Sequence, residues 1–599
     1  MQVEEAPVSN LSPAWPTSNT EHGMLVAFGE FLQQHGLLEQ LQQVPIDQKT
    51  RAFTPQAKVI EFLAGIMSGI EHLQDLNAGP HPLVRDRCVA QAWGLAGFAH
   101  YSSVSRTLAE GDDQTVAAVE AAITAFSRPF IETTVHELLR RGQPLVYDFD
   151  LTGQAVSSTS TTYPDVAFGW MNDQVRLGYQ LARVCLSPVT GERLWLAGFH
   201  HPGDTVSAAC LQELLRAAEA QTGVRPHRRP ELVAQRIEAQ QAVMDRTRRL
   251  IAQHQSNLDQ LNQTQTALIG KCYHAQQVQK GSIPAGKLAL LQKQVAGWHK
   301  RQPRLAKQIA LTQRVLVEHQ TRLSEQEIQL TQLRSWQAQL TADNQANPDP
   351  PPHIEARMDA GFASGENLTW LIEMGYWPDT KALNGRTTTV LRAQLPRSPI
   401  WQTVGDNAEM VLVGEHGLYD CPYPLSLAVE RFKIGRSFKY ATLVRYGPAP
   451  TLAAWFAHYN ARQTIEAGNK EMKTTFHVQH LMSHSAAGIR LQVIFTGLAA
   501  NVVRWCRPWL QTCAAEPTPT VIRMLTSTKQ LVRVAANSAA LVQNTSAGLG
   551  LLFAPASALP GAIFCLRGVD AFQLPLGFNR PLQITSDSTK GHLVAQNLR

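Results

Sequence analysis

The residues best placed to do chemistry lie in residues 459–473, YNARQTIEAGNKEMK. If this segment is one helix, at about 100° per residue, Tyr459, Arg462, Glu466, Lys470 and Lys473 share a face about 80° wide. One carboxylate among three cations and a phenol indicates a site for an anionic ligand, with the acid as a metal ligand or proton-transfer group. The alternative is a solvated face stabilised by pairs four residues apart, such as Glu466 with Lys470.

Other acidic residues occur where strands are expected. In QPLVYDFDLTGQ (143–154) apolar and polar residues alternate, which places Asp148 and Asp150 on the same polar face of a strand. Asp359 follows the strand-like segment IEARM and precedes Gly361. Carboxylate oxygens bind Mg²⁺ directly, and two ions about 4 Å apart activate the attacking oxygen and stabilise the leaving one. Carboxylates from two strands and a helix therefore predict a two-metal phosphoryl-transfer site.

Three motifs resemble one known family. The spacing Tyr-x2-Arg-x3-Glu-x6-Lys is met by residues 459–473, RMDAGFAS surrounds Asp359, and YDFDLTG ends in a D-x-T at Asp150. Together they are similar to insertion-sequence DDE transposases, over roughly residues 50–510. The resemblance implies an α/β ribonuclease-H-like catalytic core. The sequence pattern adds a helical N-terminal domain, a β-rich insertion and a long antiparallel coiled-coil insertion, which departs from the short connection usual in related cores.

The resemblance also implies roles for individual acids. Asp150, Asp359 and Glu466 would be the catalytic, metal-binding triad, holding two Mg²⁺ ions, with Mn²⁺ as a substitute. Asp148 remains the alternative first aspartate, because it shares the polar face of the strand. Asp150 is favoured because it occupies the D-x-T position.

DNA contacts are expected from the cationic helix. Tyr459, Arg462 and Lys473 would contact phosphates near the cut, with Lys470 on the same stripe. Arginine binds phosphate in bidentate fashion, whereas lysines act as point charges. Arg106 is expected to bind DNA from GLAGFAHYSSVSRTL (94–108), which resembles a helix-turn-helix; a generic helical hairpin is the alternative.

The activity implied is Mg²⁺-dependent DNA cleavage at transposon ends, followed by strand transfer into target DNA. The partners would be double-stranded DNA, carrying terminal inverted repeats or acting as target, and a second copy of the chain when DNA is bound. Two alternatives remain: a nuclease on the same fold without strand transfer, and a domesticated, non-catalytic DNA-binding protein.

The pattern along the chain predicts eight segments. Long heptad runs on either side of GSIPAGK (281–287) predict the coiled-coil hairpin, which ADNQANPDPPPH ends. The expected segments are a loose leader (1–20), a helical N-terminal DNA-binding domain (21–142), the first core part (143–227), the hairpin (228–347), the second core part (348–384), a β-rich insertion (385–447), the third core part with the catalytic helix (448–512) and a C-terminal region (513–599).

Composition predicts an ordinary soluble protein, and the resemblance implies a place in the bacterial cytoplasm, associated with the nucleoid. The 599 residues carry a formal charge of +6, with 44% hydrophobic residues. The eight cysteines form no C-x-x-C pair. We expect no signal peptide and no membrane span.

Weaker candidates are a histidine group and two aromatic residues. His477, His480 and His484 have the spacing of metal ligands on a helix, although solvated or DNA-facing histidines are the simpler interpretation. Trp401 and Phe438, in the β-rich insertion, are candidates for stacking on a flipped base or for simple core packing.

Overall fold

The computed structural model describes residues 17–171, 173–188, 192–351, 353–383, 385–544 and 548–568, and two short strands at 585–586 and 593–594. The chain divides into two compact units. The main unit contains Met1–Arg225, Pro351–Leu371 and Tyr376–Arg599, and the hairpin unit contains Pro226–Pro350 with Ile372–Gly375. The fold is mixed α/β.

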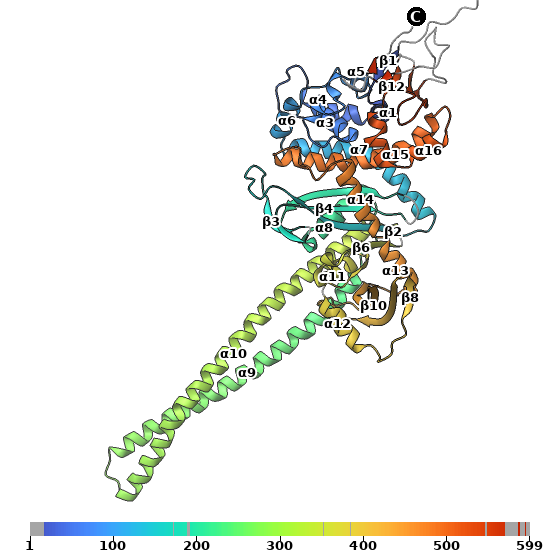
Figure 1. Cartoon of the computed structure of the whole chain (residues 1–599). Helices are drawn as coiled ribbons and strands as arrows, with labels where there is room; N and C mark the ends of the chain where they lie inside the picture. The colour runs from blue at the N-terminus through green and yellow to red at the C-terminus, as the bar shows by residue number, and fades with distance from the viewer. Residues whose placement is uncertain are drawn as a thin grey trace, which may run out of the picture. The chain divides into compact units, whose positions relative to one another are not determined.

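The main unit is built on a mixed sheet (Figure 1). Among the described residues it has ten strands, in the order β3-β4-β2-β6-β7-β11-β10-β9-β8, with β5 also paired to β4. The strands are β2 (Leu145–Ala155), β3 (Ala167–Met171), β4 (Gln174–Leu186), β5 (Leu194–Pro202), β6 (Ile354–Met358), β7 (Trp377–Lys381), β8 (Gln402–Gly405), β9 (Ala408–His416), β10 (Leu425–Ile434) and β11 (Ser437–Arg445).

Strand direction changes at β2. It pairs antiparallel with β4 but parallel with β6, and β6 pairs parallel with β7. The strands β8 to β11 belong to the predicted β-rich insertion, and β11 pairs antiparallel with β7. The insertion is therefore continuous with the sheet that carries β2 and β6, and it begins with a helix, α12 (Gly385–Gln394), rather than a strand.

Helices fill the N-terminal region, as its three-four periodicity predicts. They are α1 (Gly23–Gln34), α2 (Leu37–Gln42), α3 (Pro55–Ser68), α4 (Asp75–Ala78), η1 (Leu83–Arg85), α5 (Arg87–Ala92), α6 (Tyr101–Glu110) and α7 (Asp113–Arg140). Local chemistry sets their ends. In α3, the Thr54 hydroxyl accepts from the Ala57 N–H, Pro55 occupies the first turn, and Gly69 closes the helix at a φ of 76°.

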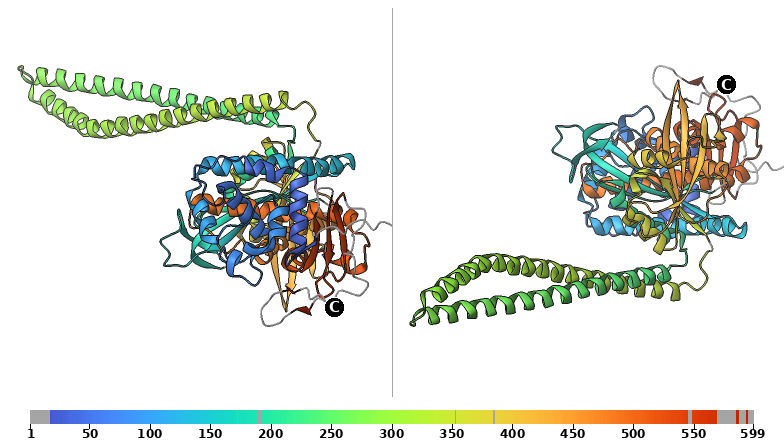
Figure 2. Two further views of the ribbon diagram at one scale, coloured as in Figure 1. Left: turned by 90° about the horizontal axis from the view of Figure 1, so that it is seen from above. Right: turned by 90° about the horizontal axis from the view of Figure 1, so that it is seen from below.

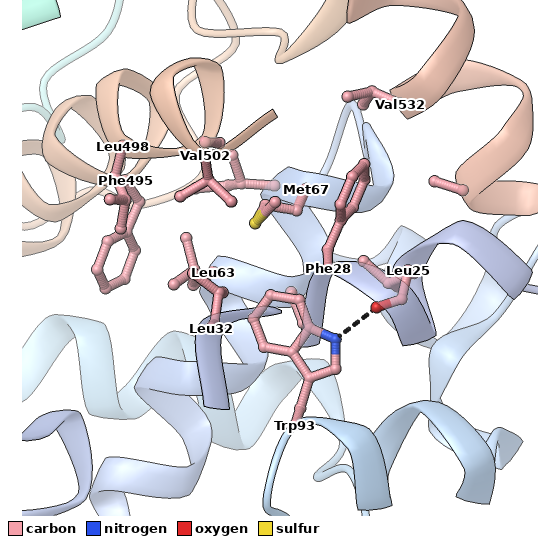
Figure 3. Packing of buried hydrophobic residues seen from close by; sticks show 14 of the residues in the cluster. Leu25, Phe28, Leu32, Leu63, Met67, Trp93, Phe495, Leu498, Val502 and Val532 are labelled. Carbon is pink, nitrogen blue, oxygen red and sulfur yellow. Dashed lines mark hydrogen bonds between the residues drawn. The ribbon is translucent and has the colours of Figure 1, made fainter. Parts of the chain in front are cut away.

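The N-terminal helices share a hydrophobic core with the C-terminal region. Figure 3 shows Leu63 close to Phe495 and Val502 of α15 (Ala486–Cys513). Phe28 lies beside Met67 and Val532, and the Trp93 indole N–H donates to the Leu25 carbonyl at 3.0 Å. Strands of the C-terminal region join the same core. The N-terminal and C-terminal regions are therefore parts of one compact unit.

Further helices lie, along the chain, between the strands of the sheet and in the C-terminal region. They are α8 (Ser207–Thr222), α11 (Gly365–Glu373), α13 (Leu452–Asn460), α14 (Gln463–Thr475), α15 (Ala486–Cys513), α16 (Pro519–Leu525) and α17 (Thr528–Arg533), with 3₁₀ turns η2 (Ala360–Phe362) and η3 (Ala535–Asn537). Of the helices in the described part of the chain, α15 alone is long and apolar enough to cross a membrane, and 78% of its most apolar window is buried inside the protein.

A second sheet pairs residues 17–20 with strands of the C-terminal region. It has the order β1-β12-β13-β14, from β1 (Thr17–Thr20), β12 (Ala540–Asn544), β13 (Leu549–Phe553) and β14 (Ile563–Arg567). The prediction of a loose leader is therefore wrong for residues 17–20, because their backbone pairs with β12. Residues 1–16 lie outside the described residues. A short pair, β15 (Thr585–Ser586) and β16 (Leu593–Val594), completes the described strands.

The hairpin unit consists of α9 (Pro230–Gln279) and α10 (Ala285–Gln345), which run side by side in opposite directions (Figure 2). Leu258 of α9 packs with Leu305, Ile309 and Leu316 of α10 in one apolar cluster. Near the open ends of the hairpin, Arg228 pairs with Asp343 at 3.2 Å. Apolar heptad positions thus form a buried seam, and polar residues cover the outside.

Candidate metal-binding and active site

Two adjacent parallel strands bring the first two acids together. The register of β2 with β6 ends at Phe149 opposite Met358; Asp150 is the next residue of β2, and Asp359 is the residue that follows β6. Asp359 caps the turn η2, where its Oδ1 accepts from the Gly361 N–H at 2.9 Å. Both carboxylates are thus held at one place at the edge where β6 ends.

The third acid is supplied by α14, which packs against β2. Arg462, just before this helix, connects the acids: its Nη2 donates to Glu466 Oε1 at 2.8 Å and its Nη1 lies 3.5 Å from Asp150 Oδ1. The Glu466 side chain is 57% exposed, whereas that of Asp150 is 11% exposed. Three carboxylates therefore share a neighbourhood in which one guanidinium faces two of them.

Burial and neighbouring charges raise the pKa of Asp150 and of Asp359. Burial raises the pKa of Asp150 to about 6; the negative charges of Asp359 and Glu466 add to the rise, and Arg462 opposes it. Burial also raises the pKa of Asp359, again opposed by Arg462. Burial with mutual repulsion is relieved when a divalent cation binds, and three carboxylates form the hard oxygen donor set that Mg²⁺ prefers. The residues present therefore fit such an ion.

Asp148 has a different environment. It is fully buried, and its two oxygens accept from Arg357 Nε at 2.6 Å and Nη2 at 2.8 Å. Ser187 Oγ donates to Oδ2 at 2.6 Å. Although Asp148 and Asp150 are two residues apart on one strand, only Asp150 faces Arg462 and the other acids; both oxygens of Asp148 are taken by a bidentate ion pair.

A hydrogen-bond network behind Asp150 was not predicted from the sequence. Asn469 Nδ2 and Thr152 Oγ1 both donate to Asp150 Oδ2, the latter at 3.0 Å. Arg183, opposite Asp150 in the β2–β4 register, donates to Asn469 Oδ1 at 2.9 Å. A signal for Asn469 was present, since it lies three residues after Glu466 and so on a neighbouring helix face. For Arg183 no sequence signal exists, because strand pairing alone places it there.

The predicted single helix over residues 459–473 is wrong. α13 ends at Asn460 and α14 begins at Gln463, and a tight turn, with Arg462 N–H donating to the Tyr459 carbonyl at 3.0 Å, separates them. Tyr459 is buried against Trp455, and its hydroxyl donates to the Met358 carbonyl at 3.3 Å. It therefore packs beneath the strand that leads to Asp359 and does not share an exposed stripe with the lysines.

The two lysines of α14 differ in environment. Lys470 is exposed. Lys473 is half-buried. Its pKa is lowered by burial and by the neighbouring Arg183, and the charge of Asp150 opposes this shift in part. Lys473 therefore lies close enough to the acid cluster to sense Asp150, and Lys470 meets solvent.

Arg106 lies apart from the acids, on α6. It is exposed, and its guanidinium donates to the Ser102 carbonyl at 3.2 Å and to Ser103 Oγ at 3.1 Å. It lines a cavity of about 640 Å³ together with Lys49, Arg51 and other residues of the helical region.

The three candidate histidines do not lie on a helix, because α14 ends at Thr475 and α15 begins at Ala486. His480 instead meets Glu71 and His72 from the segment after α3, with His480 Nδ1 3.0 Å from Glu71 Oε1. The metal site that the histidine spacing suggested is therefore not formed by these three residues together.

The aromatic candidates of the β-rich insertion are covered by a cation. The Arg431 guanidinium lies 4.1 Å from the Trp401 ring centroid and 4.6 Å from that of Phe438. Phe438 is 40% exposed. Both rings therefore contact an arginine that also pairs with Glu409 at 2.6 Å.

Comparison with known proteins gives no further assignment. No model of a known protein family matches the chain, and no curated protein matches it either.

Proposed function

We propose that the chain is a DDE transposase with a ribonuclease-H-like catalytic core, which cuts DNA at transposon ends and transfers the strand into target DNA. One observation carries the proposal. Acids predicted from motifs at positions 150, 359 and 466 meet: Arg462 contacts two of them, and the third follows the adjacent parallel strand. These three residues are far apart in the sequence, and the spacing within each motif does not by itself bring them together. Their convergence supports a shared site.

The roles follow from the environments. Asp150, Asp359 and Glu466 would hold two Mg²⁺ ions, or Mn²⁺ in their place. Bound there, the metal ions would supply Lewis acidity for phosphoryl transfer. The surroundings favour Asp150 over Asp148 as the first ligand, since both oxygens of Asp148 already bind Arg357.

The chain's own groups would orient the acids and the DNA. Asn469 and Thr152 fix the rotamer of Asp150 through its Oδ2. Arg462 neutralises the acids in the metal-free chain, and would turn to a DNA phosphate when metal replaces it. Lys473 and the exposed Lys470 would add point charges for the phosphate backbone. Tyr459 would support the Asp359 strand from below, a role in packing in place of the phosphate contact expected from its motif.

The same proposal includes double-stranded DNA as partner, with Arg106 and its cationic neighbours contacting it, a homodimer on DNA, and a place in the bacterial cytoplasm at the nucleoid. Two ends must be cut and joined together, which is the reason to expect two copies.

The test is a cleavage and strand-transfer assay with Mg²⁺, on DNA that flanks the encoding gene and so carries the element's ends. Wild type is compared with Asp150→Asn, Asp359→Asn and Glu466→Gln. Cleavage and joined products in wild type alone support the proposal. Cleavage without joining would favour the nuclease. DNA binding without cleavage, unaffected by the three substitutions, would favour the non-catalytic DNA-binding protein.

A further inference from the structure

The net positive charge of the coiled-coil hairpin is concentrated in the half next to its turn. Residues 260–317 contain nine Lys and Arg and no Asp or Glu, a formal charge of +9, whereas the whole chain carries +6. The other half, residues 230–259 and 318–345, has six basic and eight acidic residues, a formal charge of −2. The hairpin is therefore strongly polarised along its length.

The cations near the turn are available to a partner. All nine are exposed. Of these nine, Arg314 alone forms an ion pair in the described part of the chain, with Glu318 at 3.0 Å, and its side chain is 79% exposed. Exposed cations without acidic neighbours repel one another, so this arrangement favours a polyanion that neutralises them together.

Four of the cations form a straight row on α10. Lys293, Lys300, Lys307 and Arg314 follow one another at intervals of seven residues. At about 100° per residue they lie about 140–200° from Ile309, which belongs to the buried seam, so the row faces away from α9. The row of Lys293, Lys300, Lys307 and Arg314, here called the cationic row, spans about 32 Å of helix.

We propose that the cationic row binds the phosphate backbone of double-stranded DNA. Its length is close to one helical turn of B-DNA, about 34–36 Å. Contacts of this kind position a protein on DNA without reading its sequence. The charge, exposure and spacing of the row indicate a polyanionic partner without reference to the proposed function. The choice of DNA among polyanions rests on the proposed function.

A membrane surface fits less well. A helix that lies in a bilayer interface needs a continuous apolar face, and the apolar seam of α10 is buried against α9. The exposed Leu290 and Leu311 are three heptads apart, and Gly297 and Arg304 occupy the same heptad position between them. The outer surface of α10 therefore offers charge without a continuous apolar stripe.

The test compares two fourfold variants of the full chain. K293Q/K300Q/K307Q/R314Q removes the cationic row. R246Q/R249Q/R322Q/R334Q removes the same charge from exposed positions of the other half of the hairpin, where acidic residues are interspersed. Glutamine is a good helix former, so both variants retain the helices, which circular dichroism verifies. Binding of a fluorescent 30-bp duplex of arbitrary sequence is measured by anisotropy in EDTA, between 50 and 200 mM NaCl.

The salt dependence decides the outcome. If all four side chains contact phosphate, the slope of log affinity against log salt falls by about 3.6 in the row variant. Raising salt from 50 to 200 mM then costs wild type about 150-fold more affinity than it costs the row variant. The control variant keeps the wild-type slope. Equal slopes for the two variants would overturn the proposal.

A second arm identifies the partner class. Vesicles containing phosphatidylserine replace the duplex, and loss of vesicle binding in the row variant with unchanged DNA binding would overturn the proposal in favour of a lipid surface. Because EDTA prevents cleavage, this result is separate from the proposed function. If the chain never cleaves DNA but its DNA binding depends on the cationic row, the inference stands. If the chain cleaves and joins DNA but its DNA binding does not depend on the cationic row, only the inference fails.

Discussion

Replacing Asp150 and Asp148 by asparagine is expected to change stability in opposite directions, although the residues are two positions apart. Asp150 has a pKa of about 6 in the folded chain against an ordinary value of 3.8. At pH 7 this difference destabilises the metal-free fold by about 3 kcal/mol. Asp150→Asn removes that penalty but places an amide N–H near Arg462, so we expect a net gain of about 1–2 kcal/mol.

The pH dependence has a definite sign. Between about pH 4 and pH 6 the folded chain holds a proton on Asp150 that the unfolded chain has lost. The free energy of unfolding therefore falls as pH rises through this window, and the advantage of Asp150→Asn grows through it and is complete above it.

Asp148→Asn has the reverse effect. The side chains of Asp148 and Arg357 are 0% and 4% exposed, and the aspartate accepts two hydrogen bonds from the guanidinium. Removing its charge leaves a buried guanidinium without a counter-ion, at a cost of about 3–5 kcal/mol.

The measurement is urea denaturation of the full chain at pH 7 in EDTA, followed by tryptophan fluorescence, with the exposed Asp406→Asn as control. We expect the midpoint to rise for Asp150→Asn, fall clearly for Asp148→Asn and stay unchanged for the control. Repeating it at pH 4 should abolish the gain from Asp150→Asn. A comparable loss of stability from both substitutions would refute the distinct electrostatic environments inferred for the two aspartates.

Asn469→Ala leaves Asp150 without one of its orienting donors and is expected to lower Mn²⁺ affinity 10–100-fold, measured by calorimetry, whereas Thr474→Ala on the same helix should not. Adding 10 mM Mg²⁺ should raise the melting temperature of wild type and leave that of Asp359→Asn unchanged; an equal rise in both would place the metal elsewhere. Tyr459→Phe removes one long hydrogen bond, so DNA binding and cleavage should stay within about threefold of wild type while the free energy of unfolding falls by about 1 kcal/mol. A large loss of DNA affinity with normal stability would restore the phosphate contact.

Several elements follow from local sequence because their causes are local. Heptad apolar positions on both sides of a Gly/Pro turn predict α9 and α10, and the alternation in YDFDLTG predicts β2. The spacing of apolar residues within a helix or strand indicates which of its faces is buried, and this spacing can be read from that segment alone.

The break before α14 escaped this reasoning. A wheel drawn through residues 459–473 treats the chain as one helix, but the turn at Ala461 and Arg462 redirects it. Packing of Tyr459 and Trp455 against the β10 side of the sheet decides the direction of α13, and such packing has no local signal.

The sequence by itself determined the types of the chemical groups, their spacing, and the elements on which Asp150, Asp359 and Glu466 lie. Only the tertiary structure decided which groups meet. The β2–β6 register places Asp148 opposite Arg357, so Asp150 is the aspartate that contacts Arg462. The β2–β4 register places Arg183 opposite Asp150, where it binds Asn469. Partner choice depends on strand pairing and helix docking between segments hundreds of residues apart, and no periodicity within a segment specifies it.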